Sequence, residues 1–222
     1  MRFVRKYSPK TYDRKEILRR IMNFVAECKV EGDYLEFGVY KGSTFVEAVK
    51  MAKAKRLTSM KFFAFDSFQG LPTPEGVDKN FGQFYGGQVS NSLVGFRKVL
   101  SSNKINLDEV EVVSCWFKDT LNKENEELLN LKSAAVIWID CDLYGSTHTC
   151  LDFITDLVVD GTIIVLDDYF FYKGRPDMGE RNAFAEWLKN NPNFSATEFH
   201  KYSWHGNSFI IHRSDGSLVK DI

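Results

Sequence analysis

The sequence has few of the features that mark a secreted, membrane-spanning or nucleic-acid-binding protein. Its 222 residues carry a net charge of −1 at pH 7, so no overall positive field would attract nucleic acid. No apolar run is long enough to cross a bilayer, and the N-terminus MRFVRKYSPK lacks the apolar centre of a signal peptide. We therefore expect a cytoplasmic protein with no nucleic-acid partner.

Cysteine is also scarce, and no C-x-x-C pair is present. The four cysteines, Cys28, Cys115, Cys141 and Cys150, are predicted to be reduced core residues. A hydrophobic content of 44% is enough for a chain of this length to bury a core without disulfides. We expect one domain over residues 1–222, with a basic helical segment at 1–30 and the catalytic core at 31–222.

The N-terminal segment is the one strongly charged part of the chain. Residues 1–22 contain eight Lys or Arg and two acidic residues. From Asp13 to Cys28 the apolar residues recur at helical spacing, which predicts a helix with one packed face and one solvated basic face. The alternative is that the basic face attracts an anionic substrate or a membrane surface.

Two apolar runs near the middle of the chain end in carboxylates. Residues 136–139 and 162–166 are β-branched and nearly free of polar side chains, as in strands buried on both faces of a parallel sheet. Residues 146–159 are predicted to be the helical crossover, with Gly161 ending it. The strands run into a set of four aspartates: Asp140, Asp142, Asp167 and Asp168. Ligands bind at this edge of open α/β sheets.

These carboxylates would repel one another unless a cation, a proton or basic side chains neutralised them. All-oxygen ligands favour a hard cation, Mg²⁺ first, with Mn²⁺ and Ca²⁺ as alternatives. The competing interpretation is that each aspartate caps a helix or closes a turn. Because aspartates occur at the ends of two separate strands, we favour a site that these aspartates share.

A nucleotide-binding unit is predicted earlier, at residues 33–54. An apolar strand enters a glycine-containing turn, where Gly38 would let the backbone approach a ligand and Ser43 or Thr44 would cap the next helix. The G-x-G-x-x-G spacing of a dinucleotide site is absent, which argues against NAD. A second strand, 61–65, ends at Asp66, which could accept hydrogen bonds from an adenosine ribose or cap the following turn.

The remaining segments predict loops around that site. Residues 68–90 hold five glycines and two prolines and read as a binding loop or lid. Trp116 and Asp119, after a third strand at 110–115, could pack against an adenine ring and meet its polar edge. The other predictions are helices at 91–100, 124–131 and 180–189, an aromatic substrate loop at 169–176, and an antiparallel hairpin at 195–212. Among the histidines only His205 is a candidate for a catalytic test.

Five segments resemble one enzyme family. LEFGVYKGST, FAFDSFQGLP, WFKDTL, IDCDLYGST and LDDYF occur in the order found in S-adenosylmethionine-dependent O-methyltransferases of the macrocin and mycinamicin type. The resemblance covers roughly residues 34–187. It implies a class I methyltransferase fold, which is a Rossmann-like three-layer α/β sandwich with a mostly parallel seven-stranded sheet and an antiparallel last strand.

The resemblance also implies the site. It implies Mg²⁺ bound by Asp140, Asp167 and Asp168, with Asp142 as the general base. Catechol-type enzymes are similar, but their last metal ligand is usually Asn. We expect S-adenosylmethionine to contact these residues: Glu36, Gly38, Ser43, Thr44, Asp66, Ser67, Trp116, Asp119 and Asp140.

The predicted function is therefore Mg²⁺-dependent methyl transfer to a hydroxyl of a sugar, a sugar-containing small molecule or a polysaccharide, with a phenol as an open alternative. Two other functions remain. A metal-dependent hydrolase or phosphoesterase would need histidines or a second metal near the aspartates, and only His148 is close in sequence. A non-catalytic S-adenosylmethionine-binding module would bind without turnover. The exposed N-terminal helix is compatible with a homodimer.

Overall fold

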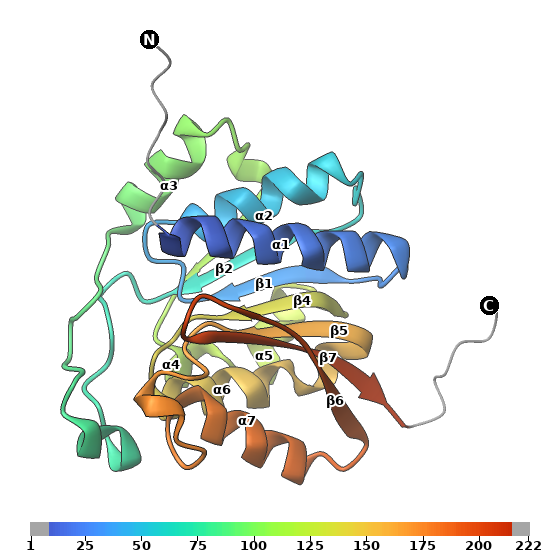
Figure 1. The fold of residues 1–222 in the computed structure, drawn as a ribbon. Coiled ribbons are helices and arrows are strands. Elements are labelled where there is room, and N and C mark those ends of the chain that lie inside the picture. Colours follow the sequence, from blue (N-terminus) through green and yellow to red (C-terminus); the bar gives the residue numbers. More distant parts are fainter. Residues whose placement is uncertain (1–8, 215–222) are drawn as a thin grey trace.

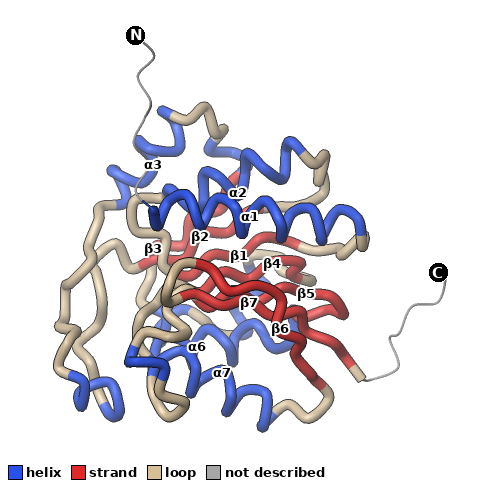
Figure 2. Tube along the Cα trace, in the orientation of Figure 1, coloured by secondary structure: helices blue, strands red, loops and turns tan. Residues whose placement is uncertain are grey.

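The computed structural model describes residues 9–214, without the side chains of residues 9–13, 80 and 81. Basic residues at 1–13 therefore lie outside the described side chains. Figure 1 shows a central sheet with helices on both faces, and Figure 2 separates the strands from the helices and loops. None of the described helices is both long and apolar enough to span a membrane.

The sheet has seven strands in the order β3-β2-β1-β4-β5-β7-β6. The strands are β1 (Asp33–Phe37), β2 (Phe62–Asp66), β3 (Val110–Ser114), β4 (Ala134–Ile139), β5 (Val158–Leu166), β6 (Phe194–Tyr202) and β7 (Gly206–Arg213). The pairs from β3 to β5 are parallel, and β7 runs antiparallel to both β5 and β6. This confirms the predicted α/β fold with an antiparallel last strand and the C-terminal hairpin.

Helices cover the two faces of the sheet. The helices are α1 (Pro9–Glu27), α2 (Ser43–Ala54), α3 (Leu93–Ser102), α4 (Phe117–Thr120), α5 (Lys123–Leu128), α6 (Tyr144–Ile154) and α7 (Gly179–Asn190). Short 3₁₀ turns are η1 (Gly76–Phe81), η2 (Leu107–Glu109), η3 (Thr155–Leu157) and η4 (Tyr172–Gly174). In Figure 1, α1, α2 and α3 lie on one face and α5, α6 and α7 on the other.

Strand alternation divides the core between these faces, since successive side chains point to opposite sides of a sheet. Tyr34 of β1 packs with the cluster under α1 and α2, whereas Leu35 packs with the cluster under α6 and α7. The apolar face of α1 is buried at Ile17, Leu18 and Ile21. The predicted helix with one packed face is therefore confirmed.

Several local predictions are wrong. β5 begins at Val158, so Gly161 lies inside the strand and does not end the crossover. Neither Ser43 nor Thr44 caps α2, because Gly42 with a φ of 78° occupies the N-cap without a side-chain bond. The order reversal between β1 and β4 still creates the crevice where open α/β sheets bind ligands.

Two further predictions need correction. The 68–90 segment is not wholly irregular, because it contains η1. Cys28 is exposed and Cys115 half-buried, so only Cys141 and Cys150 are core residues, although all four cysteines are free as expected. Cys28 follows the last residue of α1, Glu27.

Candidate active site

A cavity of about 1520 Å³ opens at the carboxyl ends of the parallel strands. Ligand pockets commonly measure about 300–1,000 Å³, so this one has room for a nucleotide-sized cofactor and a second molecule. Most of the residues predicted for the site line it: Glu36, Gly38, Ser43, Thr44, Asp66, Ser67, Trp116, Asp119, Asp140, Asp142 and Asp168. Asp167 is not among the lining residues, and its side chain is only 1% exposed.

Gly38 allows the ends of β1 and β4 to approach each other closely. Its φ is +87°, and a Cβ atom built there would lie 2.0 Å from the main-chain oxygen of Asp140. No side chain fits at that distance from a backbone oxygen. The glycine is therefore required by the close approach of two strand ends, in addition to any approach to a ligand.

Asp66 organises the turn that carries Gly38. Its Oδ2 accepts hydrogen bonds from the amides of Val39 and Tyr40, at 2.9 and 3.0 Å, and its Oδ1 accepts one from Phe68 at 2.7 Å. The turn-capping alternative is thus present in the structure. An ionised carboxylate has about four acceptor positions. Three are used, which leaves one for a ribose hydroxyl.

Glu36 is an almost fully buried carboxyl among the residues that line the cavity. It is 1% exposed and accepts a hydrogen bond from the Tyr34 hydroxyl. Burial, with the nearby charge of Asp140 adding to it, raises the pKa of Glu36 well above its ordinary value. A protonated Glu36 could donate a hydrogen bond to a ligand as well as accept one.

Arg14, on α1, reaches the acidic cluster, by which we mean Asp140, Asp142, Asp167 and Asp168. Its Nε donates to Asp167 Oδ1 at 3.0 Å, and its Nη2 contacts Asp167 Oδ2 and lies 3.0 Å from Asp140 Oδ2. The interpretation of a wholly solvated basic face is therefore wrong for this residue. The signal was available in the sequence, because Arg14 precedes Ile17 by three residues and Leu18 by four and so shares their face.

The side-chain carboxyl groups of Asp142 and Asp168 form a hydrogen bond with each other. Burial, with the charge of Asp140 adding to it, raises the pKa of Asp142 to about 7. Burial, with the charge of Asp142 adding to it, also raises the pKa of Asp168. Asp142 has a φ of +61°, a left-handed conformation that costs energy for a residue with a side chain. Such strain is common at functional sites.

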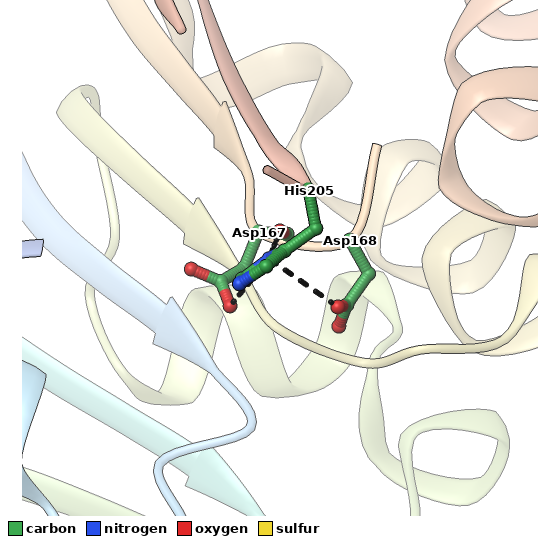
Figure 3. Close-up of side chains that lie close together, drawn as sticks. All are labelled: Asp167, Asp168 and His205. Atoms are coloured by element: carbon green, nitrogen blue, oxygen red, sulfur yellow. Dashed lines mark hydrogen bonds and ion pairs between the residues drawn. The ribbon is translucent and has the colours of Figure 1, made fainter. Parts of the chain in front are cut away.

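His205 lies beside the aspartates at the end of β5, as Figure 3 shows. Its Nδ1 contacts the main-chain oxygen of Asp167 and lies 3.6 Å from Asp168 Oδ1. Its Nε2 is buried and has no hydrogen-bond partner among the described residues. Asp167, Asp168 and His205 offer ligand atoms within 4.8 Å of one another, which suits a metal ion. His148 is the one histidine close to the aspartates in sequence, but the β6–β7 turn also brings His205 next to them in space.

The predicted oxygen ligands suit a divalent cation in their chemistry. Asp167 and Asp168 already lie close together at the end of β5. Asp140 faces the same space but is paired with Arg14. The ligand atoms that lie within 4.8 Å of one another in the described residues are those of Asp167, Asp168 and His205, while Asp140 is joined to Asp167 through Arg14.

Glu180 is a buried residue for which the sequence suggested only a helical position. Its carboxylate accepts hydrogen bonds from the amide of Asp168 at 2.9 Å and from that of Cys141 at 3.3 Å. It therefore joins the ends of β4 and β5. Burial, with the charge of Asp168 adding to it, raises the pKa of Glu180 well above its ordinary range. A charged residue on the first turn of an otherwise apolar helix face was the only sequence signal.

Aromatic side chains form one wall beside the acidic cluster. Phe84 lies 5.5 Å from Phe171 and Phe171 lies 5.3 Å from Trp204, measured between ring centroids. Phe84 and Phe171 line the cavity. Trp204, in the β6–β7 turn, is 62% exposed. We call these three residues the aromatic wall.

The comparisons with known proteins place the chain among O-methyltransferases. A family model described as macrocin O-methyltransferase (TylF) matches residues 8–187. Mycinamicin III 3''-O-methyltransferase of Micromonospora griseorubida is 30% identical over 147 residues, which are 63% of this chain and 56% of that protein. The 8-demethyl-8-(2,3-dimethoxy-alpha-L-rhamnosyl)-tetracenomycin-C 4'-O-methyltransferase of Streptomyces olivaceus is 29% identical over 145 residues, 63% of this chain and 54% of that protein.

The matched segment thus spans little more than half of each of these relatives. Among solved structures, the O-methyltransferase NovP superposes with a TM-score of 0.77 at 23% sequence identity, covering 90% of this chain and 80% of that one. At that identity the likeness establishes the shared fold.

Proposed function

Because this chain belongs to the macrocin O-methyltransferase family, we propose that it transfers a methyl group from S-adenosylmethionine to a hydroxyl oxygen of a sugar-containing molecule. One observation carries the proposal. The glycine turn after β1 and the carboxyl group of Asp142 line the same cavity. A cofactor bound at the turn would therefore lie in the same space as an acceptor held at the acidic cluster.

The proposed cofactor site is built around the turn after β1 and the neighbouring strand ends. Its residues are Glu36, Gly38, Ser43, Thr44, Asp66, Ser67, Trp116, Asp119 and Asp140, all at the cavity surface. Asp66 is proposed to bind the ribose with its remaining acceptor position, and Trp116 and Asp119 to bind the adenine.

The proposed chemistry at the acidic cluster is proton removal from the acceptor. A Mg²⁺ ion bound by Asp140, Asp167 and Asp168 would place positive charge beside the acceptor oxygen and lower the pKa of its hydroxyl. Asp142 would take the proton. Without a metal ion, burial and the charge of Asp140 raise the pKa of Asp142 to about 7, so this carboxyl group can exchange a proton near neutral pH. S-adenosylmethionine bound at the turn would supply the methyl group, with its carbon–sulfur bond breaking as the oxygen–carbon bond forms and S-adenosylhomocysteine leaving. The residues of the cavity would hold both molecules in contact.

The acceptor is proposed to be a sugar ring. The S. olivaceus relative is named for a rhamnosyl-bearing substrate. In this chain the aromatic wall offers flat apolar surface beside Asp168, and the apolar face of a sugar ring can pack against it while a hydroxyl faces Asp142. We keep the cytoplasmic location and a homodimer as predictions.

A metal-dependent hydrolase or phosphoesterase remains the second candidate, and one observation favours it. That function would need histidines or a second metal near the aspartates, and His205 Nδ1 lies 3.6 Å from Asp168 Oδ1. Release of p-nitrophenol from p-nitrophenyl phosphate in the presence of Mg²⁺, without methyl transfer to any acceptor, would favour the hydrolase.

The test of the main proposal is calorimetric titration of S-adenosylhomocysteine into the wild type and Asp66→Asn, with and without Mg²⁺. Asn keeps one oxygen for the amides of Val39 and Tyr40 and loses the acceptor for Phe68, whereas Ala would remove the acceptors of all three amides. We expect micromolar binding by the wild type and a loss of roughly tenfold or more in Asp66→Asn, since a bond to a charged group contributes about 1.5–3 kcal/mol.

Asp108→Asn, on the exposed turn η2, is the matched control. No binding by the wild type would refute the methyltransferase. Binding without transfer of labelled methyl from S-adenosylmethionine to hydroxylated sugars or phenols would favour the non-catalytic module.

A further inference from the structure

Helix α1 fixes the position from which Arg14 reaches the cluster. Ile17, Leu18 and Ile21 are at most 2% exposed and anchor the helix to the sheet. Arg14 lies one turn before them on the same face, and its side chain is 25% exposed. The packing of α1 against the sheet therefore fixes the guanidinium at the C-terminal ends of the parallel strands.

The guanidinium pairs with two of the three proposed metal ligands at once. It contacts both carboxylate oxygens of Asp167, and the same Nη2 atom lies 3.0 Å from Asp140 Oδ2. Asp167 Oδ1 also accepts a hydrogen bond from the Tyr202 hydroxyl at 2.6 Å. A buried carboxylate needs such partners, because an unpaired charge in the interior is strongly unfavourable.

A divalent ion and this guanidinium compete for the same oxygens. Mg²⁺ requires oxygen ligands at about 2.0–2.1 Å in near-octahedral geometry. An ion bound by both Asp140 and Asp167 would take the position that Nη2 holds between them. Two cations a few ångströms apart repel each other, so the two occupants exclude each other.

We infer that Arg14 is a built-in counter-ion for the proposed metal site: it neutralises Asp140 and Asp167 when the metal is absent and leaves them when a divalent cation binds. This inference rests on the proposed metal site. Arg14 would thereby keep the aspartates in place without metal and weaken metal binding. The two binding equilibria are coupled. The factor by which bound metal weakens the contact of Arg14 with the aspartates equals the factor by which that contact weakens metal binding, so removing the guanidinium should raise the affinity for metal.

The test measures binding of Mg²⁺ and Mn²⁺ alone, by calorimetry and by the shift in Tm, on the full chain after treatment with EDTA. The variants are Arg14→Met, which keeps the length and removes the charge, and Arg14→Lys, which keeps the charge but cannot form the two-pronged contact. Arg20→Met is the control, because Arg20 lies on the same helix but pairs with Glu16 at the surface.

We expect Arg14→Met to lower Tm in EDTA and to bind the metal about tenfold more tightly than the wild type, with Arg14→Lys in between and Arg20→Met unchanged. A purely structural role would lower Tm without tightening binding. Equal or weaker metal binding by Arg14→Met would overturn the inference. If Arg14→Met does not fold, Arg14→Lys carries the test, and unchanged affinity in it has the same meaning.

The same titrations separate this inference from the proposed function. If neither wild type nor variants bind metal, the proposed metal site itself fails and the inference fails with it. If the wild type binds metal and S-adenosylhomocysteine but Arg14→Met binds metal no better, only the counter-ion role fails.

Discussion

Glu36 illustrates how a single buried carboxyl links this site to stability. The group lies in β1 with 1% of its surface exposed, and its only described side-chain hydrogen bond is from Tyr34. Burial disfavours its charged form and raises its pKa well above the ordinary value of 4.5. Native Glu36 therefore keeps its proton at pH values where the unfolded chain has lost it.

This difference sets the sign of a pH effect. Below about pH 4.5 both states are protonated, and Glu36 contributes its full stability. As the pH rises toward the raised pKa of the native group, the unfolded state binds fewer protons and the free energy of unfolding falls. We predict that Glu36→Gln removes this decline, so that the variant is more stable than the wild type at about pH 8 but not at about pH 4.5.

Urea unfolding of both proteins across this range is the measurement. Glu124→Gln, at an exposed position of α5, is the control and should follow the wild type. Parallel pH profiles for wild type and Glu36→Gln would contradict the prediction.

At the scale of elements, Asp78 joins the 68–90 segment to α6. Its two carboxylate oxygens accept hydrogen bonds from the amides of Tyr144 and Gly145, at 2.9 and 3.1 Å. These amides belong to the first turn of α6, which has no capping side chain at its own N-cap, Leu143. The segment thus supplies the cap from a distance of 66 residues in sequence.

Removing this contact should loosen the segment. We predict that Asp78→Ala lowers the free energy of unfolding by about 0.5–2 kcal/mol, as for other lost helix caps. It should also speed proteolysis within residues 68–90. Asp108→Ala, an exposed aspartate, should do neither. Urea unfolding and limited proteolysis with mass mapping measure both effects, and an unchanged cleavage rate in Asp78→Ala would refute the tie to α6.

The aromatic wall is assembled by three separate loops. The β6–β7 turn is held to the segment after β5 by a hydrogen bond from the Phe170 amide to the main-chain oxygen of His205, at 2.8 Å. This places the exposed ring of Trp204 5.3 Å from Phe171. The turn therefore contributes both His205 and Trp204 to the same region.

If the wall binds the acceptor, Trp204→Ala should raise KM for the acceptor by about twofold to tenfold, the range expected for one lost aromatic contact of about 0.5–1.5 kcal/mol. Its affinity for S-adenosylhomocysteine should not change, because Trp204 is not among the residues that line the cavity and reaches it only through its contact with Phe171. Leu128→Ala removes a similarly exposed apolar side chain from α5 as the control. An unchanged KM in Trp204→Ala would exclude the ring from acceptor binding.

At the scale of the whole molecule, one sheet is shared by both hydrophobic cores. Trp138 and Val165 face the cluster beneath α1 and α2, whereas Ile137 and Ile164, on the same strands, face the cluster beneath α6 and α7. Neither core can be lost without exposing a face of β4 and β5. This supports the prediction that the chain is one domain.

We therefore predict a single cooperative unfolding transition, with coincident midpoints for far-ultraviolet circular dichroism and tryptophan fluorescence in urea. S-adenosylhomocysteine at 100 times its Kd should stabilise the native state by about 2.7 kcal/mol and raise Tm by roughly 5–11 °C. Two separated transitions, only one of which responds to the ligand, would contradict a single domain.

The sequence alone was sufficient for the sheet and for the side of the molecule on which the site lies. Apolar runs separated by helical segments require parallel strands, and the carboxyl ends of parallel strands meet at one edge. Asp66, Asp140, Asp142 and Asp168 therefore had to line one region. Their exact hydrogen-bond partners did not follow, and Asp66 shows why: two of its three amide donors come from a different βα turn, 26 and 27 residues away.

Only the tertiary structure decided which other groups join the aspartates. Arg14 meets Asp167 across 153 residues, Tyr202 and His205 meet it across 35 and 38, and Glu180 meets Cys141 across 39. Periodicity determines which face of an element is apolar, because that depends on neighbours within one or two turns. It does not determine which distant element that face meets. That is decided by how the helices and the C-terminal hairpin pack on the sheet, and so the charge balance of the site emerges only in the folded molecule.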